Sequence, residues 1–418
     1  MYLKVWADET KQPKNPSNNF VMTETSIQIE KIQGVAKNMN FDLAEFNLLS
    51  CDLQKFKKFI EALEKKIDHP TAVLAAFYLV DGRKLDDIGK GLDFLALAKI
   101  NCEITLAKKQ NEIKTVQDKA DIVFDVLNWL NGRDPDFEKY NYEKNLTLPE
   151  TMERIEQIGL NEGKNPIAQC MSLSLLFYLT MHAIGEGDKV KLWLAEVRQG
   201  DMNNRHLYTK VAEKIYENTN SYSDCNKELS NLYAKTEAKN IWPILVEVMS
   251  GILDEKRIKT LEEKVRNDIE LDEQEVTFLE ERVAFLKKCR ELDNTNPRIL
   301  SQLNHNSQIL INAYSEGQPM RYLSLSINIS NVLIEYGNWF AAAYNKIQVV
   351  ELKNDIRVNR LPYYRGQLEY GKKLIEGILK VLENQPPDFL EQIKEQKITL
   401  EKQQTIICEL LEKEPYKQ

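Results

Sequence analysis

Residues 165–210 have the sequence NPIAQCMSLSLLFYLTMHAIGEGDKVKLWLAEVRQGDMNNRHLYTK. Pro166 suits the entry to a helix, and Cys170 falls in the first turns of that helix. The helix continues as an apolar run over 171–184 and ends at Gly185-Glu186-Gly187. Two serines, a threonine and a histidine interrupt the run, which favours a helix buried in a protein core over a membrane span.

Two short strands are predicted to follow this helix. Apolar residues alternate with polar ones over 190–197, and a second strand-like segment covers 206–211. The second segment begins with His206, so one helix and one strand separate it from Cys170. That path length would bring the histidine back beside the start of the helix. The stretch therefore predicts a small α+β core that could form a thiolate and its base.

Cys170 and His206 are the candidate catalytic residues. A helix N-terminus lowers the pKa of a thiol, and a neighbouring histidine can take the thiol proton. Asp224 is the first candidate to orient the histidine, with Glu213 and Glu217 as alternatives. The other interpretation is structural: an inert core thiol, a loop histidine and an aspartate that caps a helix or turn.

The composition predicts a mainly helical globular protein. The 418 residues include 43% hydrophobic and 29% charged residues, with only 16 glycines and 13 prolines. The net charge of −8 and the lack of a dominant basic block argue against nucleic acid or an anionic membrane as the main partner. The N-terminus lacks the pattern of a secretory signal peptide.

Cysteine and histidine usage argues against a disulfide framework or a metal site. The six cysteines lie far apart with no CxxC pair, and there are only four histidines. We therefore expect a cytoplasmic protein without a cofactor or metal and without a stable membrane span, although export by a specialised secretion system stays open. The cysteines are Cys51, Cys102, Cys170, Cys225, Cys289 and Cys408, and the histidines are His69, His182, His206 and His305.

Hydrophobic periodicity divides the chain into four parts. A helical face is predicted after Asp52, which is the candidate N-cap, and another helix is predicted to open at Pro70. The predicted parts are an N-terminal segment at 1–25, a helical domain at 26–140, the α+β core at 141–225, and a helical domain at 226–418 with a helical hairpin at 255–292 and repeat-like helices at 297–382.

Residues 327–356 have the strongest repeat character. Helices are predicted at 320–336 and 339–352, with Gly337 between them at the place where two short helices would close against one another.

The string AQCMSLSLLFYLTMHAIG, followed by a strand and then HLYTKV, resembles the central part of the transglutaminase-like superfamily, which has a papain-like fold. Gln169-Cys170 looks like the Gln-Cys pair of that superfamily. The chain departs from the pattern at Met171, where an aromatic residue is usual, and at His206-Leu207-Tyr208, where His-x-Trp is usual. A helical leader before this core and tetratricopeptide-like (TPR-like) helices after it are similar to bacterial members with a repeat tail.

The resemblance implies a cysteine-dependent amide-bond enzyme that acts on a protein or peptide. Cys170 would be the nucleophile, His206 the base and Asp224 the orienting residue, while Gln169 or the Cys170 backbone N–H would donate to the oxyanion. Protease, deamidase and acyl-transfer chemistry all stay open, as does the oligomeric state. The alternatives are a non-catalytic helical protein-interaction module and an exported bacterial effector.

Overall fold

The computed structural model divides the chain into two compact units. The first comprises residues 1–195, 206–229 and 235–248, and the second comprises residues 196–205, 230–234 and 249–418. The predicted segment 26–140 falls in the first unit, and so does the predicted segment 141–225 apart from residues 196–205. The structure describes residues 18–48, 51–132, 147–159, 170–195, 206–216, 235–238, 241–251, 255–293, 296–314, 319–346, 350–383 and 385–417.

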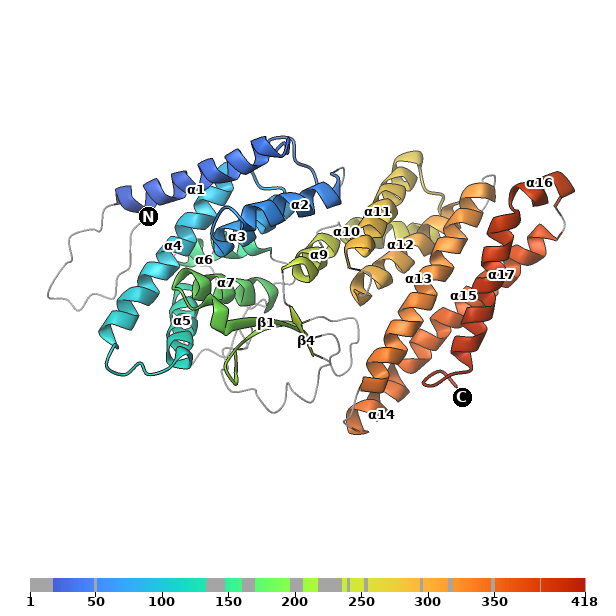
Figure 1. Cartoon of the computed structure of the whole chain (residues 1–418). Helices are drawn as coiled ribbons and strands as arrows, with labels where there is room; N and C mark the ends of the chain where they lie inside the picture. Colours follow the sequence, from blue (N-terminus) through green and yellow to red (C-terminus); the bar gives the residue numbers. More distant parts are fainter. Residues whose placement is uncertain are drawn as a thin grey trace. The chain divides into compact units, whose positions relative to one another are not determined.

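In the residues that the structure describes, the first unit begins with helices α1 to α7 (Figure 1). α1 packs on α4, α3 packs on α2 and α4, and α7 contacts α3, α4, α5 and α6. The predicted helical segments of this region are confirmed, with α1 beginning inside the segment that was expected at 1–25. The helices are α1 (Asn18–Asn38), α2 (Leu53–Glu64), α3 (His69–Val80), α4 (Leu85–Lys108), α5 (Val116–Leu130), α6 (Leu148–Gly159) and α7 (Cys170–Ala183).

Side-chain caps set the starts of several of these helices. Asp52 accepts hydrogen bonds from the backbone N–H groups of Gln54 and Lys55, as predicted for the N-cap of α2. Asp68 accepts a hydrogen bond from the Thr71 backbone N–H and so caps α3, whose second residue is the proline that was predicted to open it. These caps satisfy N–H groups that have no partner inside the helix, so they fix where each helix begins.

α3 and α7 form the apolar centre of this unit. Every residue from Thr71 to Val80 is buried, and Leu175, Leu176 and Phe177 of α7 are at most 1% exposed. Both helices are apolar on all sides because neighbours surround them. In the parts of the chain that the structure describes, no helix combines the length and apolar character needed to cross a membrane.

A four-stranded antiparallel sheet lies beside α7 in the order β3-β2-β1-β4. The predicted strands at 190–197 and 206–211 correspond to β1 and β2. The strands are β1 (Val190–Ala195), β2 (His206–Val211), β3 (Lys214–Tyr216) and β4 (Lys235–Ala238). The fold class, mainly α with a small α+β core, is therefore confirmed.

Two strands were not predicted. β3 follows β2 through a tight turn in which Ala212 has φ of 51°, a left-handed conformation that usually selects glycine or asparagine. β4 has the polar sequence KTEA and lies at the edge of the sheet, in a region expected to be helical. Neither strand carries the alternating apolar pattern on which the prediction depended. α9 (Trp242–Gly251) follows β4, and the Trp242 ring meets Phe56 of α2 edge to face.

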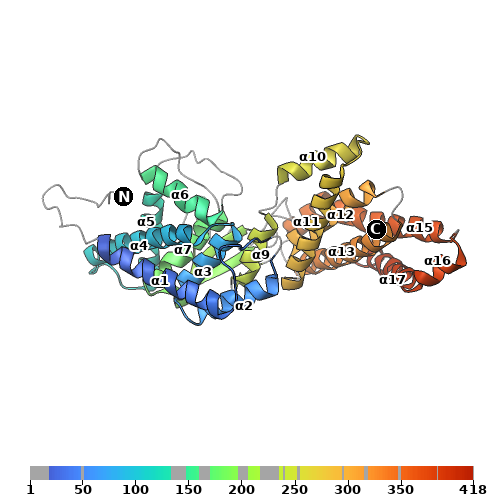
Figure 2. The ribbon, with the colours of Figure 1, turned by 90° about the horizontal axis from the view of Figure 1, so that it is seen from above.

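The second unit is helical in all of its described elements. α11 packs on α12 and α12 on α13, and α13, α15 and α17 pack on one another (Figures 1 and 2). The 255–292 range, predicted as a hairpin, holds α10 and α11, which touch through a 2.5 Å Lys264–Glu275 ion pair. The helices are α10 (Glu255–Arg266), α11 (Glu273–Leu292), α12 (Pro297–Ala313), α13 (Pro319–Lys346), α14 (Val350–Asn359), α15 (Leu361–Leu382), α16 (Pro387–Gln392) and α17 (Lys394–Leu411).

The predicted break at Gly337 is wrong, because α13 runs through it as one helix of 28 residues. Gly337 instead marks a close approach between helices: a Cβ there would lie 3.0 Å from Leu368 of α15. Gly371 of α15 marks a second close approach between the same two helices, since a Cβ at that position would lie 2.8 Å from Leu333 of α13. The glycines thus remove side chains where two helices cross and do not end either helix.

Candidate functional site

The predicted nucleophile and base are each the first residue of an element. Cys170 begins α7, and His206 begins β2, where it pairs with Ala195 at the end of β1. The side chains of Cys170 and His206, like residues Gln169, Asp224 and Glu217, lie outside the described part of the structure. The backbone therefore supplies the geometry of this site.

Element lengths bring these two residues to the same end of the core. α7 has 14 residues and is about 21 Å long. β1 has six residues and is about 20 Å long. Only residues 184–189 connect the end of α7 to the start of β1. A strand of equal length that returns along the helix ends near the helix start, at Ala195 and its partner His206.

A buried hydrogen bond fixes this alignment independently. The Ser174 hydroxyl donates to the Leu207 carbonyl over 2.9 Å, and both residues are completely buried. Cys170 lies one turn before Ser174, about 6 Å along the helix axis. His206 lies one residue before Leu207, about 3.3 Å along the strand. Residues 170 and 206 thus lie on the same side of the Ser174–Leu207 hydrogen bond.

Glu213, an alternative orienting residue, is at the wrong end of β2. It lies in the turn between β2 and β3, where its carboxylate is 3.1 Å from the Lys210 ammonium. The side chain is 96% exposed. His206 is at the opposite end of the strand, about 17 Å from Val211 at its last residue. Glu213 therefore cannot orient the imidazole.

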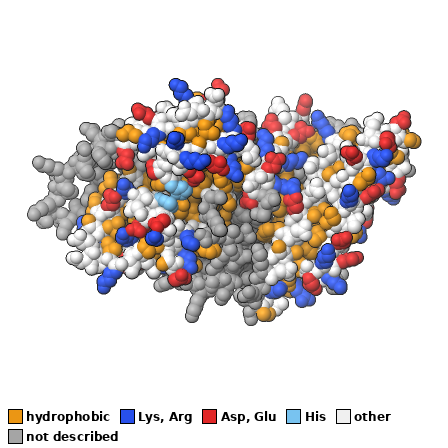
Figure 3. Space-filling model, in the orientation of Figure 1, with side chains coloured by type: hydrophobic (Ala, Val, Ile, Leu, Met, Phe, Trp, Pro, Cys, Tyr) orange, Lys and Arg blue, Asp and Glu red, His pale blue; other side chains and the backbone are white. Residues whose placement is uncertain are grey.

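A second cluster of ionisable groups lies at the other end of α7. His69 Nε2 is 2.9 Å from the Tyr178 hydroxyl, and His69 Nδ1 is 3.4 Å from the Glu64 carboxylate. The His182 ring centroid is 4.6 Å from that of His69 and 4.5 Å from that of Tyr178. Gly187 makes room for this ring, since a Cβ there would fall 2.0 Å from His182 Nδ1. Histidine atoms are visible on the surface of the first unit in Figure 3.

This cluster keeps His182 neutral. Burial, reinforced by the charge of His69, lowers the pKa of His182 from 6.5 to about 4, against a smaller opposing effect of Asp188. Burial also raises the pKa of Tyr178 to about 12. Sequence reasoning missed this grouping, because His69 and His182 are far apart along the chain.

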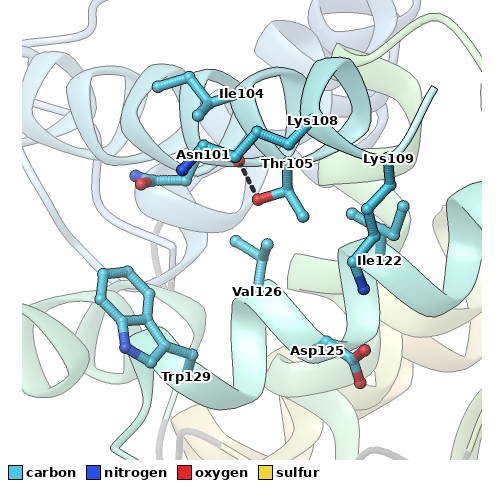
Figure 4. Close-up of a pocket in the computed structure, with 9 residues that line it drawn as sticks. All are labelled: Asn101, Ile104, Thr105, Lys108, Lys109, Ile122, Asp125, Val126 and Trp129. Atoms are coloured by element: carbon cyan, nitrogen blue, oxygen red, sulfur yellow. Dashed lines mark hydrogen bonds between the residues drawn. The ribbon is translucent and has the colours of Figure 1, made fainter. Parts of the chain in front are cut away.

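A concave pocket of about 340 Å³ lies between α4 and α5 (Figure 4). Ile104, Ile122, Val126 and Trp129 give it an apolar lining, and Lys108 and Lys109 close the end where α4 terminates. Sequence reasoning missed it, because two helical faces must be packed together before their concavity exists. It is separate from the predicted Cys170–His206 site, since no residue of α7 or of the sheet lines it.

Among the described residues, no cluster of three or more His, Cys, Asp or Glu side chains is arranged to hold a metal ion. Comparison with known proteins adds no assignment: no family model, curated protein or solved structure matches this chain. The resemblance to the transglutaminase-like superfamily thus stays a prediction, and functional inference rests on the geometry of the chain itself.

Proposed function

We propose that this protein is a cysteine-dependent amide-bond enzyme acting on a protein or peptide. Cys170 is the nucleophile, His206 the general base and Asp224 the residue that orients the imidazole. The observation that carries the proposal is the shared position of the first residues of α7 and β2, anchored by the Ser174–Leu207 hydrogen bond.

The start of α7 is a suitable place for a thiolate. The first backbone N–H groups of a helix have no partner within it and carry partial positive charge, which stabilises a neighbouring anion. α7 is also rigid, because its apolar side chains are packed on all sides. Such a helix holds a nucleophile at a fixed distance from a strand that packs on it, as nucleophilic catalysis requires.

The chemistry follows from these roles. His206 takes the Cys170 proton, and the thiolate sulfur attacks the amide carbonyl carbon to form a tetrahedral intermediate. Gln169 or the Cys170 N–H donates to its oxyanion. The C–N bond then breaks, the imidazolium gives its proton to the leaving amine, and a thioester remains. Water releases the acid in a protease or deamidase, and a second amine releases a new amide in an acyl transferase.

This chemistry also needs a suitable compartment and a surface that selects the substrate. A reactive thiolate needs a reducing compartment, so we place the protein in the cytoplasm. The α12–α15 helices of the second unit would select the protein or peptide substrate, in the manner of TPR-like helices.

The rate of Cys170 alkylation by iodoacetamide, followed against pH by peptide mass spectrometry, tests the proposal. In the wild type we expect an apparent thiol pKa well below about 8.5, the value of a free cysteine, and we expect His206→Ala to abolish this advantage. His305→Ala, which removes a histidine of the second unit, is the matched control.

Other cysteines provide internal standards in the same digest. Cys51 and Cys408 are half-buried, so they report the reactivity of partly accessible thiols. Cys102 is buried, and burial raises its pKa to about 12, so it reports an inert thiol. If Cys170 reacts no faster than Cys408 and is indifferent to His206→Ala, the enzyme proposal fails. The remaining function would then be a non-catalytic helical interaction module.

A further inference from the structure

The pocket between α4 and α5 has an apolar floor. Ile122 and Val126 of α5 are buried there. Ile104 of α4 and Trp129 of α5 are half-buried and extend the same apolar surface. Figure 4 shows Val126 and Trp129 facing α4, with Thr105 opposite Val126. The space between these side chains amounts to about 340 Å³. A molecule seated in it would remove apolar surface from water, which favours binding.

The charged side chains of the lining lie at its rim. Lys108, Lys109 and Asp125 are all exposed to solvent. The two lysines lie on opposite sides of the concavity, so their ammonium groups do not converge on one point (Figure 4). Partial desolvation raises the pKa of Asp125, and the charge of Lys109 opposes that rise, so these two opposite charges act on each other. The rim therefore offers no focused charge to a ligand.

The uncharged polar side chains on the α4 wall are bonded within that helix. Thr105 Oγ1 donates to the Asn101 carbonyl, as Figure 4 shows, and Asn101 Nδ2 donates to the Leu97 carbonyl, each over 2.9 Å. A charged group placed on the apolar floor would lose its hydration without gaining a partner of opposite charge, which is costly. The lining thus favours an uncharged ligand with few polar atoms.

The volume of the pocket sets the size of that ligand. A closed apolar cavity of about 150 Å³ holds one benzene molecule, and this pocket is about twice as large. The flat indole of Trp129 favours a flat partner, since aromatic rings gain from offset or edge-to-face packing. We propose that this pocket binds an uncharged molecule of about two fused rings, held by apolar contact with Ile122, Val126 and Trp129 and not by an ion pair.

Isothermal titration calorimetry of the full chain with 2-naphthol tests the proposal at about pH 7, where the hydroxyl of this probe is un-ionised, like that of tyrosine. We expect binding at one site. Phenol has the same hydroxyl and one ring fewer, so it should bind about tenfold more weakly, because it buries less apolar area. 2-Naphthoate has the same two rings and a negative charge, and it should bind no more tightly than 2-naphthol. Lys108→Gln/Lys109→Gln should leave the affinity for 2-naphthol unchanged.

Two pairs of variants test where 2-naphthol binds. Ile104→Trp places a larger side chain in the pocket and should abolish binding. Glu103→Trp adds the same ring at an exposed residue of α4 outside the lining and should have no effect. Trp129→Ala removes the aromatic wall and should weaken binding about tenfold, whereas Trp129→Phe keeps a ring there and should retain most of the affinity. Thermal unfolding checks that each variant is folded.

Several results would overturn the proposal. They are no binding of 2-naphthol, equal affinity for phenol, tighter binding of 2-naphthoate, and unchanged affinity in Ile104→Trp or in Trp129→Ala. Loss of 2-naphthol binding in the Lys108/Lys109 double variant would also overturn it, because the site would then depend on charge. No arm of the test involves Cys170, so it stands apart from the proposed enzymatic function.

Discussion

Acid should destabilise the first unit through His182, a histidine that the fold holds in its neutral form. Its ring lies against His69 and Tyr178 in the last turn of α7. Its Nε2 atom is buried and has no hydrogen-bond partner among the residues that the structure describes, so the protonated ring would have an N–H with no acceptor there. Burial, followed by repulsion from His69, accordingly lowers the pKa from 6.5 to about 4.

The sign and size of the effect follow from this shift. Between about pH 6.5 and pH 4, His182 is protonated in the unfolded chain but stays neutral in the folded chain, so proton uptake favours unfolding. The stabilisation is complete above about pH 6.5 and is lost as the pH falls toward 4. The shift corresponds to at most about 3 kcal/mol, and solvent reaching the partly exposed ring reduces this to about 2 kcal/mol.

Two measurements check the prediction. NMR titration of the histidine Cε1–Hε1 resonances, assigned with His→Gln variants, should show that the His182 signal does not titrate between about pH 7 and pH 5. Urea unfolding should show that His182→Gln reduces the loss of stability between about pH 7 and pH 4.5 by about 2 kcal/mol, whereas His305→Gln leaves it unchanged. A His182 midpoint near 6.5 would refute the reasoning.

The packing also predicts the behaviour of three variants and of one reaction. Gly371→Ala should destabilise the second unit by about 1–3 kcal/mol in urea unfolding, because its Cβ would lie 2.8 Å from Leu333 and 3.2 Å from Ile407. Gly366→Ala in the same helix, where a Cβ meets nothing within 4 Å, should instead be neutral or stabilise by up to about 1 kcal/mol, and an equal loss in both would contradict the argument. Ser174→Ala should cost about 1–3 kcal/mol and speed amide exchange at the start of β2, since the Leu207 carbonyl loses a donor; an unchanged exchange pattern would count against the anchor. Cys102 should resist iodoacetamide in the native protein at about pH 8 and react only after denaturation, because burial raises its pKa to about 12.

Local signals account for the parts of the fold that the sequence predicted well. Asp52 supplies a cap at α2, and the apolar residues that follow it at helical spacing are the buried face of that helix. The change of period after Gly187 correctly predicted the step from α7 to β1. These features depend on residues within one or two turns of each other, so they can be read without knowing what packs on them.

The misses came from tertiary contacts. Gly337 looked like a break between helices, but its role is to let Leu368 of another helix approach α13. β4 is a polar edge strand that exists because β1 offers it hydrogen bonds. In both cases a partner distant in sequence decides the structure, and a local pattern carries no information about that partner.

The candidate sites divide in the same way. The common end of Cys170 and His206 could be anticipated from the path length of one helix and one strand, and the backbone agrees with that path. Glu213 looked equally eligible until the pairing of β2 with β3 placed it at the far end of the strand. The α4–α5 pocket gave no advance signal, because its residues become a lining only when two helical faces meet.

α7 has an ionisable residue near each end, Cys170 and His182, and its length separates them electrostatically. His182 lies twelve residues after Cys170, about 18 Å along the helix axis, which exceeds the Debye length of about 8–10 Å at physiological salt. Protonation of His182 therefore acts on residue 170 through the stability of α7 and not through a direct field. Above about pH 6.5 His182 is neutral in both the folded and the unfolded chain, so that contribution is constant. The alkylation profile of Cys170 in that range reports the thiol and its base, and any loss of reactivity at lower pH must be compared with His182→Gln before it is assigned to catalysis.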